Sequence, residues 1–238
     1  MRTTPDQIVF WQYGFITLNG TIVFTWIVMA VLVGLSILAT RKLSTGRKVG
    51  KLQSAMEMIV GAVRSQMKEM LGRGGLAYLS FLGTLFLIIS ISNLLSVVPY
   101  YEPPTGSISM TAALAILVFI AVPAFGIAEK GVPGYLKHYL QPSVFMLPFN
   151  IIGELSRTLA LAVRLFGNIM SGTMIVGVLL SIAPIIVPLV MQVLGLIIGQ
   201  IQAYIFAALA TVYIGSAIRT QEKSDQKKEK QSEPDRTE

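Results

Sequence analysis

Residues 150–171 read NIIGELSRTLALAVRLFGNIMS and belong to an apolar segment at 144–180. A helix needs about 20 apolar residues to cross the roughly 30 Å hydrocarbon core of a bilayer, and this segment is longer than that. It nevertheless carries three charged side chains, Glu154, Arg157 and Arg164. Charged groups at membrane depth are costly, so they face protein or water. The stretch therefore predicts a long, tilted membrane helix with a functional polar face.

The composition of the whole chain is that of a membrane protein. Of its 238 residues, 53% are hydrophobic and 13% are charged, against about 25% charged in a soluble domain. The net charge of +7 does not indicate nucleic-acid binding, because the basic residues lie mostly between the apolar segments and in the tail. Cysteine is absent and His138 is the single histidine. Disulfides, thiol catalysis and a metal site built from Cys or His are excluded, and no cofactor is expected.

Five apolar segments predict an all-α integral membrane protein with about five transmembrane helices. They lie at roughly 18–40, 76–99, 108–128, 144–180 and 183–218. We expect the first to be retained rather than cleaved as a signal peptide, because it runs into Arg41-Lys42 without a small-x-small cleavage site. The last two are longer than a perpendicular crossing requires and are separated by Ala183-Pro184. Residues 144–218 should therefore form a long tilted hairpin.

The distribution of basic residues predicts the orientation in the membrane. Lys and Arg number eight in the segment 41–75, two in the loop 129–143 and six in the tail 219–238. The opposite side, which includes the N-terminal residues 1–17 and the turn within the hairpin 76–128, has only Arg2. We expect the N-terminus outside and the C-terminus in the cytoplasm of a bacterial-type plasma (inner) membrane.

The first basic segment also contains a helix of a different kind. Residues 52–72 place apolar side chains at helical spacing and interrupt them with Glu57, Arg64 and Lys68. This pattern predicts an amphipathic helix along the membrane surface. The tail at 219–238 is rich in Lys, Glu, Gln and Ser and is predicted to be disordered.

The two segments of the long hairpin each carry a polar face. At 100° per residue, one stripe about 100° wide on the first segment holds Glu154, Arg157, Arg164, Asn168 and Ser171. A face of the second segment holds Gln192, Gly195, Gly199, Gln202, Phe206 and Tyr213. The glycines allow close helix packing, and the Gln202 amide is able to orient the Arg164 guanidinium by a hydrogen bond.

Arg164 is the strongest candidate for a functional residue. Glu154 lies about 15 Å away along the helix, and no acidic residue in the membrane part of the chain is placed to pair with Arg164. A buried arginine without a partner in its own chain implies a carboxylate on another subunit, whereas the alternative is a satisfied structural arginine. Glu154 and Arg157 are close enough to pair with each other, and their function stays open.

The motif RLFGN at 164–168, followed by QAYIFAALATVY at 202–213, resembles the a subunit of F-type ATP synthases. NLLSVVP at 93–99 also fits that family, and the resemblance covers nearly the whole chain. It implies a non-catalytic, ion-translocating stator subunit whose tilted hairpin faces a ring of c subunits, with b-type peripheral stalk subunits as further partners. Arg164 would face a carboxylate on each ring subunit and separate two half-channels, one open to each side of the membrane.

The resemblance also implies which other residues serve the channel. Asn168 and Gln202 match family positions near the arginine, and further candidates are Glu154, Arg157, Ser171, Thr173 and Gln192; Gly195 and Gly199 would serve helix packing. The chain departs from many relatives in having no ionisable group at Asn150, Thr173 and Gly195, which suggests a divergent branch. Glu154 lies one turn after Asn150 and is a substitute for the inner half-channel. H⁺ is the favoured ion, while the oxygens of Ser171 and Thr173 would also suit Na⁺.

Three other classes of function remain as alternatives. A secondary ion-coupled transporter would use the intramembrane Arg and Gln side chains to bind an anionic substrate, but five spans give no inverted repeat. A membrane scaffold would not need charge at mid-membrane. An intramembrane enzyme lacks a nucleophile and base, and the segment Gly46–Lys51 is one residue short of a phosphate-binding loop.

Overall fold

The computed structural model consists almost entirely of helices. It describes residues 5–7, 9–13, 16–40, 78–98, 100–140, 146–182 and 186–219, with a few positions between 54 and 65. The α-helices are α1 (Gly20–Thr40), α3 (Leu79–Leu95), α4 (Ile108–Leu140), α5 (Met146–Ile182) and α6 (Ile186–Arg219). Two short 3₁₀ helices, η1 (Pro5–Gln7) and η3 (Pro104–Gly106), and an antiparallel pair of strands, β1 (Val9–Tyr13) and β2 (Ile16–Asn19), complete the described part.

The predicted all-α membrane architecture is confirmed. Within the described residues, four stretches are long and apolar enough to cross a bilayer: Gly20–Leu38, Ile108–Ala128, Pro148–Ser181 and Leu189–Ser216. The remaining apolar helix, α3, has 17 residues, a length of about 26 Å. These are the five helices that the sequence predicts to cross the membrane. The short strand pair before α1 was not foreseen, since the sequence indicated only a polar lead.

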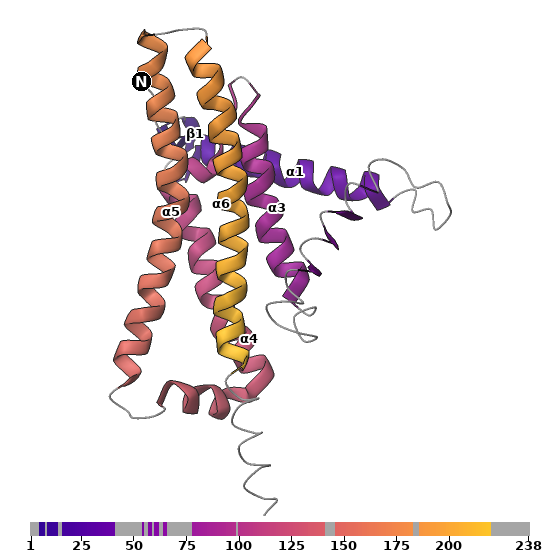
Figure 1. The fold of residues 1–238 in the computed structure, drawn as a ribbon, viewed down its shortest axis with the longest axis vertical. Coiled ribbons are helices and arrows are strands. Elements are labelled where there is room, and N and C mark those ends of the chain that lie inside the picture. The colour runs from indigo at the N-terminus through magenta and orange to yellow at the C-terminus, as the bar shows by residue number, and fades with distance from the viewer. Residues whose placement is uncertain are drawn as a thin grey trace, which may run out of the picture.

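The lengths of the helices favour a tilted arrangement of the last hairpin. The 37 residues of α5 span about 55 Å, far more than the roughly 30 Å of hydrocarbon. Figure 1 shows α5 and α6 side by side along the longest axis of the molecule, with α1 lying crosswise to them. The 21 residues of α1 suit a direct crossing. If α1 crosses the bilayer along its normal, α5 and α6 are strongly tilted away from that normal.

The main apolar core lies between α3, α4, α5 and α6. The largest buried side chains come from every one of them, and they include Leu82, Ile89, Val118, Leu161, Leu165, Phe206 and Ile214. The aromatic rings of Tyr78 and Phe125 join α3 to α4, with centroids 4.8 Å apart. Many described side chains outside this core are apolar and exposed; Trp26 on α1 and Val163 on α5 are each 61% exposed. Such a surface is suited to lipid, where burial of apolar groups brings no gain over exposure.

Proline marks the starts of the two long helices. Pro148 lies in the first turn of α5 and Pro188 in the first turn of α6, where the backbone N–H that proline lacks has no helical acceptor. The predicted turn at 183–185 between them lies outside the described residues.

The segment predicted as a loop at 129–143 is largely helical. Helix α4 continues to Leu140, with a break at Gly131, where φ is 70° and ψ is 164°. Glycine adopts this positive φ at little cost, so the chain changes direction there and resumes as a helix (Figure 1). Most of the predicted amphipathic helix at 52–72 lies outside the described residues; the positions described between 54 and 65 are helical and exposed. The tail beyond Arg219 also lies outside them.

The N-terminal segment is tied to the start of two membrane helices by Asp6. Its carboxylate accepts hydrogen bonds from Thr21 Oγ1 at 2.5 Å, from Ser107 Oγ, and from Ser109 Oγ at 3.3 Å. Thr21 lies in the first turn of α1, and Ser107 immediately precedes α4. An acidic group near helix N-termini is favoured by the helix dipole, so Asp6 fixes the loop that leads into α4.

Candidate functional site

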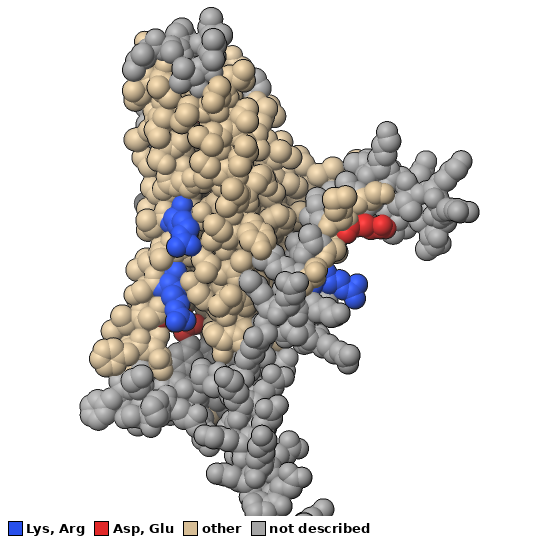
Figure 2. Space-filling model, in the orientation of Figure 1, with Lys and Arg blue, Asp and Glu red and all other residues tan. Residues whose placement is uncertain are grey.

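Arg164 lies at the middle of the membrane span Pro148–Ser181, on the outer surface of α5. Its neighbours Leu161 and Leu165 point into the core, at 1% and 0% exposure, so α5 turns Arg164 outward. Within this chain Arg164 is exposed rather than buried, and its predicted pairing with a carboxylate on another subunit stays a prediction. Figure 2 shows basic side chains over α5, surrounded mostly by uncharged side chains among the described residues. Among the described residues, no hydrogen bond or ion pair reaches the guanidinium.

Gln202 does not orient Arg164 as the sequence suggested. Its side chain is buried on α6 at 6% exposure, and its Nε2 has no hydrogen-bond partner in the structure. Gln202 belongs to the core-facing side of α6 with Ala203 and Phe206, whereas Arg164 faces away from the core. An unsatisfied buried amide costs about 1–3 kcal/mol, so the retention of Gln202 in this apolar helix needs a reason other than stability.

Arg157 is joined to the other helix of the hairpin by an aromatic contact. Its Cζ lies 5.7 Å from the centre of the Tyr213 ring on α6, within the range of a cation–π interaction. No ion pair between Glu154 and Arg157 is present among the described residues, although the sequence left that pairing open. Arg157 is exposed and Glu154 is half-buried. Both residues lie on α5 between its N-terminal end and Arg164.

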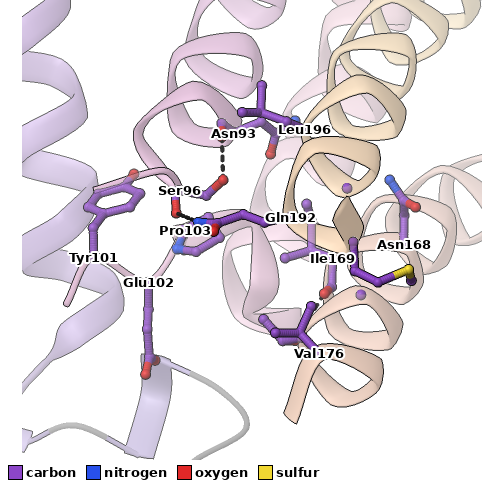
Figure 3. Close-up of a pocket in the computed structure, with 14 residues that line it drawn as sticks. Asn93, Ser96, Tyr101, Glu102, Pro103, Asn168, Ile169, Val176, Gln192 and Leu196 are labelled. Carbon is purple, nitrogen blue, oxygen red and sulfur yellow. Dashed lines mark hydrogen bonds between the residues drawn. The ribbon is translucent and has the colours of Figure 1, made fainter. Parts of the chain in front are cut away.

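A cavity of about 280 Å³ lies between α5, α6 and the loop that follows α3 (Figure 3). It gathers four residues singled out from the sequence, Asn168, Thr173, Gln192 and Gly195. Glu154, Arg157, Ser171, Gln202 and Gly199 are not in its lining. The loop side contributes Asn93, Ser96, Tyr101, Glu102 and Pro103, and apolar side chains and Gly172 complete the wall. The cavity starts one helical turn from Arg164, at Asn168.

The polar groups of this cavity are held by hydrogen bonds. Gln192 Nε2 donates to the carbonyl oxygen of Ser96 at 3.3 Å, and this bond is drawn in Figure 3. The Thr173 hydroxyl donates to its own helix, with Met170 O at 2.9 Å and Ile169 O at 3.0 Å as acceptors. A hydroxyl that donates in this way keeps its lone pairs for a cation or a water molecule.

Asn93 links α3, α6 and the loop beside the cavity, and the sequence did not indicate this contact. Its Nδ2 donates to Gly199 O at 2.7 Å, and its Oδ1 accepts from Thr105 Oγ1 at 3.3 Å. A Cβ on Gly199 would lie 3.1 Å from Asn93, whereas a Cβ on Gly195 would meet nothing within 4 Å. Gly199 thus permits the approach of α3 to α6, and Gly195 leaves space in the cavity. The signal was a polar amide inside the apolar run LIISISNLL.

Gln200 belongs to a separate contact between α3 and α6. Its Nε2 donates to Ser90 O at 2.9 Å and its Oε1 accepts from Ser90 Oγ.

The fold and this site together define a multi-pass α-helical membrane protein whose long hairpin presents a cation at mid-membrane, one helical turn from a cavity that Asn168 and Gln192 help to line. Residues 22–215 match the family model described as ATP synthase A chain, and the chain belongs to this family. The predicted resemblance to the a subunit of F-type ATP synthases is thereby confirmed, and with it the association with ATP synthesis and ion transport.

Curated relatives agree over nearly the full chain. The ATP synthase subunit a of Albidiferax ferrireducens is 59% identical over 92% of this chain and 95% of the relative. The ATP synthase subunit a 2 of Acaryochloris marina is 58% identical over 91% of this chain and 93% of the relative. The ATP synthase subunit a 1 of Chlorobaculum parvum is 58% identical over 94% of this chain and 99% of the relative.

Proposed function

We propose that this chain is the ion-translocating stator subunit of a rotary F-type ATP synthase, and that Arg164 separates two half-channels that load and unload carboxylates on a ring of c subunits. The supporting observation is an arginine at the middle of a membrane span, exposed on the outer surface of α5, with no hydrogen bond or ion pair to any described residue. The chain itself catalyses no reaction in this proposal. Its further partners are b-type stalk subunits and the lipid bilayer.

The positive charge of Arg164 supports its proposed function between the two half-channels. An arginine at the bilayer centre costs about 2.5–3.5 kcal/mol on insertion scales. No described residue supplies its counter-charge, and in this proposal a carboxylate of the ring does. At an effective dielectric constant of 20, two unit charges 4 Å apart attract by about 4 kcal/mol. An approaching ring carboxylate is therefore favoured in its ionised form and releases its ion. The fixed positive charge also opposes the direct passage of a cation from one half-channel to the other.

The cavity beside Asn168 is the proposed outer half-channel. It lies against the loop between α3 and α4, which the distribution of basic residues assigns to the non-cytoplasmic side. Glu154 and Arg157, nearer the N-terminal end of α5, are the proposed residues of the inner half-channel. This assignment requires the N-terminus outside and the C-terminus in the cytoplasm of a bacterial-type plasma membrane.

The translocated ion is proposed to be H⁺, with Na⁺ as the alternative. The described cavity offers amide, hydroxyl and carbonyl oxygens, which suit a chain of water molecules or a hard cation. ATP-driven pumping by the purified complex in vesicles, measured with and without Na⁺, separates the two. Pumping that is unaffected by Na⁺ eliminates the sodium version.

A cross-linking experiment tests the orientation of the hairpin. The chain has no cysteine, so single cysteines need no background removal. Ser171 is exposed and lies seven residues after Arg164, on the same face of α5. In the assembled complex, Ser171→Cys should form a disulfide with a cysteine placed beside the ring carboxylate.

Ser36→Cys is the matched control, because Ser36 is exposed on α1, which lies crosswise to the hairpin (Figure 1). It should give no adduct with the ring. Equal cross-linking from both positions, or none from position 171 in a complex that still pumps, contradicts the proposed orientation.

A further inference from the structure

We propose that Ser90 and Gln200 are positioning residues of the ion channel: their paired hydrogen bonds fix the rotation of α6 about its own axis, and thereby decide which of its side chains face the cavity. This inference rests on the proposed function and adds two residues to it. Neither residue lines the cavity, so both act through the direction of α6 and not by contact with the ion.

The two residues are joined at both polar ends of one side chain. The Oε1 atom of Gln200 accepts a hydrogen bond from Ser90 Oγ, and its Nε2 atom donates to the backbone oxygen of Ser90 at 2.9 Å. Both residues are half-buried. A single hydrogen bond lets a donor swing around its acceptor, whereas two bonds to one residue set a direction as well as a distance.

The neighbouring residues repeat this contact in the opposite direction. Asn93 on α3 donates from Nδ2 to the backbone oxygen of Gly199 on α6 at 2.7 Å. Each helix therefore sends a side-chain amide to a backbone carbonyl of the other. A Cβ on Gly199 would lie 3.1 Å from Asn93, so the two backbones approach closely here. Interhelical hydrogen bonds and small residues hold membrane helices together, because the lipid provides no hydrophobic driving force between them.

These contacts lie where the packed part of α6 ends. From Gly199 to Ile214, α6 buries a side chain at every turn. None of the described residues 189–198 is buried, yet this part of α6 supplies Gln192 and Gly195 to the wall of the cavity. The wall therefore has little core packing to fix its direction, and it takes that direction from the contacts made at residues 199 and 200.

A rotation of α6 would exchange the residues that form this wall. Gln192 lies eight residues before Gln200, about 12 Å along the helix axis, and its Nε2 atom reaches the backbone oxygen of Ser96 at 3.3 Å (Figure 3). A rotation of about 100°, the angle between successive residues, would bring the apolar Val193 into the place of Gln192. The paired bonds between Ser90 and Gln200 oppose that rotation, so ion transport depends on them.

Disulfide formation between α3 and α6 measures the rotation in the whole complex, purified and reconstituted in vesicles. The chain has no cysteine, so Ser96→Cys is combined either with Gln192→Cys or with Val193→Cys under a mild oxidant. With Gln200 present, the pair at 96 and 192 should form faster than the pair at 96 and 193. Gln200→Leu should lower the ratio of the two rates about threefold or more, the population shift that loss of one interhelical hydrogen bond allows.

ATP-driven ion pumping by complexes without the cysteines links the rotation to transport. Gln200→Leu should slow pumping about threefold or more, because the same population shift displaces the cavity wall. Thr84→Ala is the matched control on α3. The Thr84 hydroxyl is exposed and donates to its own helix, at 2.6 Å from the backbone oxygen of Ser80, so this variant should behave as wild type in both measurements.

Two further variants separate positioning from stability. The double variant Ser90→Ala with Gln200→Leu replaces both polar partners by apolar side chains, so its thermal stability should match wild type. Its disulfide ratio and its pumping rate should nevertheless stay low. Ser90→Ala alone keeps the bond from Gln200 Nε2 to the backbone and should change both less than Gln200→Leu does. Should Gln200→Leu prevent assembly, Ser90→Ala decides, and a wild-type ratio in it overturns the proposal.

The proposal is also overturned if the disulfide ratio is the same with and without Gln200, if the ratio falls while pumping stays at the wild-type rate, or if the double variant restores both. Equal rates for the two pairs with Gln200 present overturn it too, because the rotation of α6 is then not fixed. These results concern α6 alone. Failure of the proposed function would instead appear as coupled pumping by a variant without Arg164.

Discussion

Asn93 on α3 donates a hydrogen bond across 2.7 Å to the backbone carbonyl oxygen of Gly199 on α6. This contact joins the loop over the cavity to the long hairpin, because the same amide accepts a hydrogen bond from Thr105. The absence of a side chain at residue 199 is what allows it: a Cβ there would lie 3.1 Å from both Cγ and Nδ2 of Asn93.

Gly199→Ala should therefore displace Asn93 and destabilise the chain by about 1–3 kcal/mol, as overpacking of a filled interior does. The measurement is the thermal stability and yield of the purified complex. Gly83→Ala on α3 is the control, since a Cβ at Gly83 meets nothing within 4 Å, and it should match wild type. Equal stability of the two variants would show that Gly199 is not a packing constraint.

Gln202→Leu should separate stability from transport. The buried Nε2 of Gln202 has no hydrogen-bond partner in the structure, so an apolar side chain of similar size should leave stability unchanged or raise it. Ion transport should nevertheless be impaired without being abolished, if Gln202 serves the channel as the resemblance implies. Wild-type transport rates would remove Gln202 from the site.

Tyr101 should affect stability in alkali and leave transport near neutral pH unchanged. Burial raises the pKa of Tyr101 to about 12 from its usual value of 10.0. Between these two values the folded chain holds a proton that the unfolded chain has lost, so stability falls as pH rises through this window. Tyr101→Phe should weaken that fall, which thermal unfolding at pH values from about 9 to 12 measures.

Tyr100→Phe is the matched control, because the Tyr100 side chain is fully exposed. It should reproduce the wild-type dependence on alkaline pH. An identical dependence in wild type and Tyr101→Phe would contradict the burial of the Tyr101 hydroxyl.

The membrane helices and Arg164 could be predicted from the sequence because each depends on local chemistry. An apolar run of sufficient length has few alternatives to a spanning helix, and a charged residue within such a run is recognised from the sequence alone. The side on which Arg164 lies could not be predicted in the same way. The helical repeat places Arg164 on one stripe with Glu154, but only packing shows that Leu161 and Leu165 take the core and leave Arg164 outside.

The cavity depended on long-range contacts and was for that reason only partly predictable. Asn168, Thr173, Gln192 and Gly195 were candidates from their helices, and the structure brings them together. Glu102 was read as part of an interfacial turn. Its place beside the cavity follows from Tyr100, whose positive φ turns the chain inward. The expected hydrogen bond between Gln202 and Arg164 does not form. Helical periodicity gives the angular position of each residue on its own helix, but it does not give the rotation of one helix relative to the other.

The central claim is that the guanidinium of Arg164 meets carboxylates supplied by a neighbouring ring, and ATP-driven ion pumping by the purified complex in vesicles tests it most directly. Arg64→Ala, which removes an exposed cation elsewhere, controls for the loss of charge. We predict that Arg164→Ala assembles normally and pumps no ions, and that Arg164→Lys also fails, because an ammonium lacks the planar fork of the guanidinium. Pumping at the wild-type rate by Arg164→Ala would contradict the account.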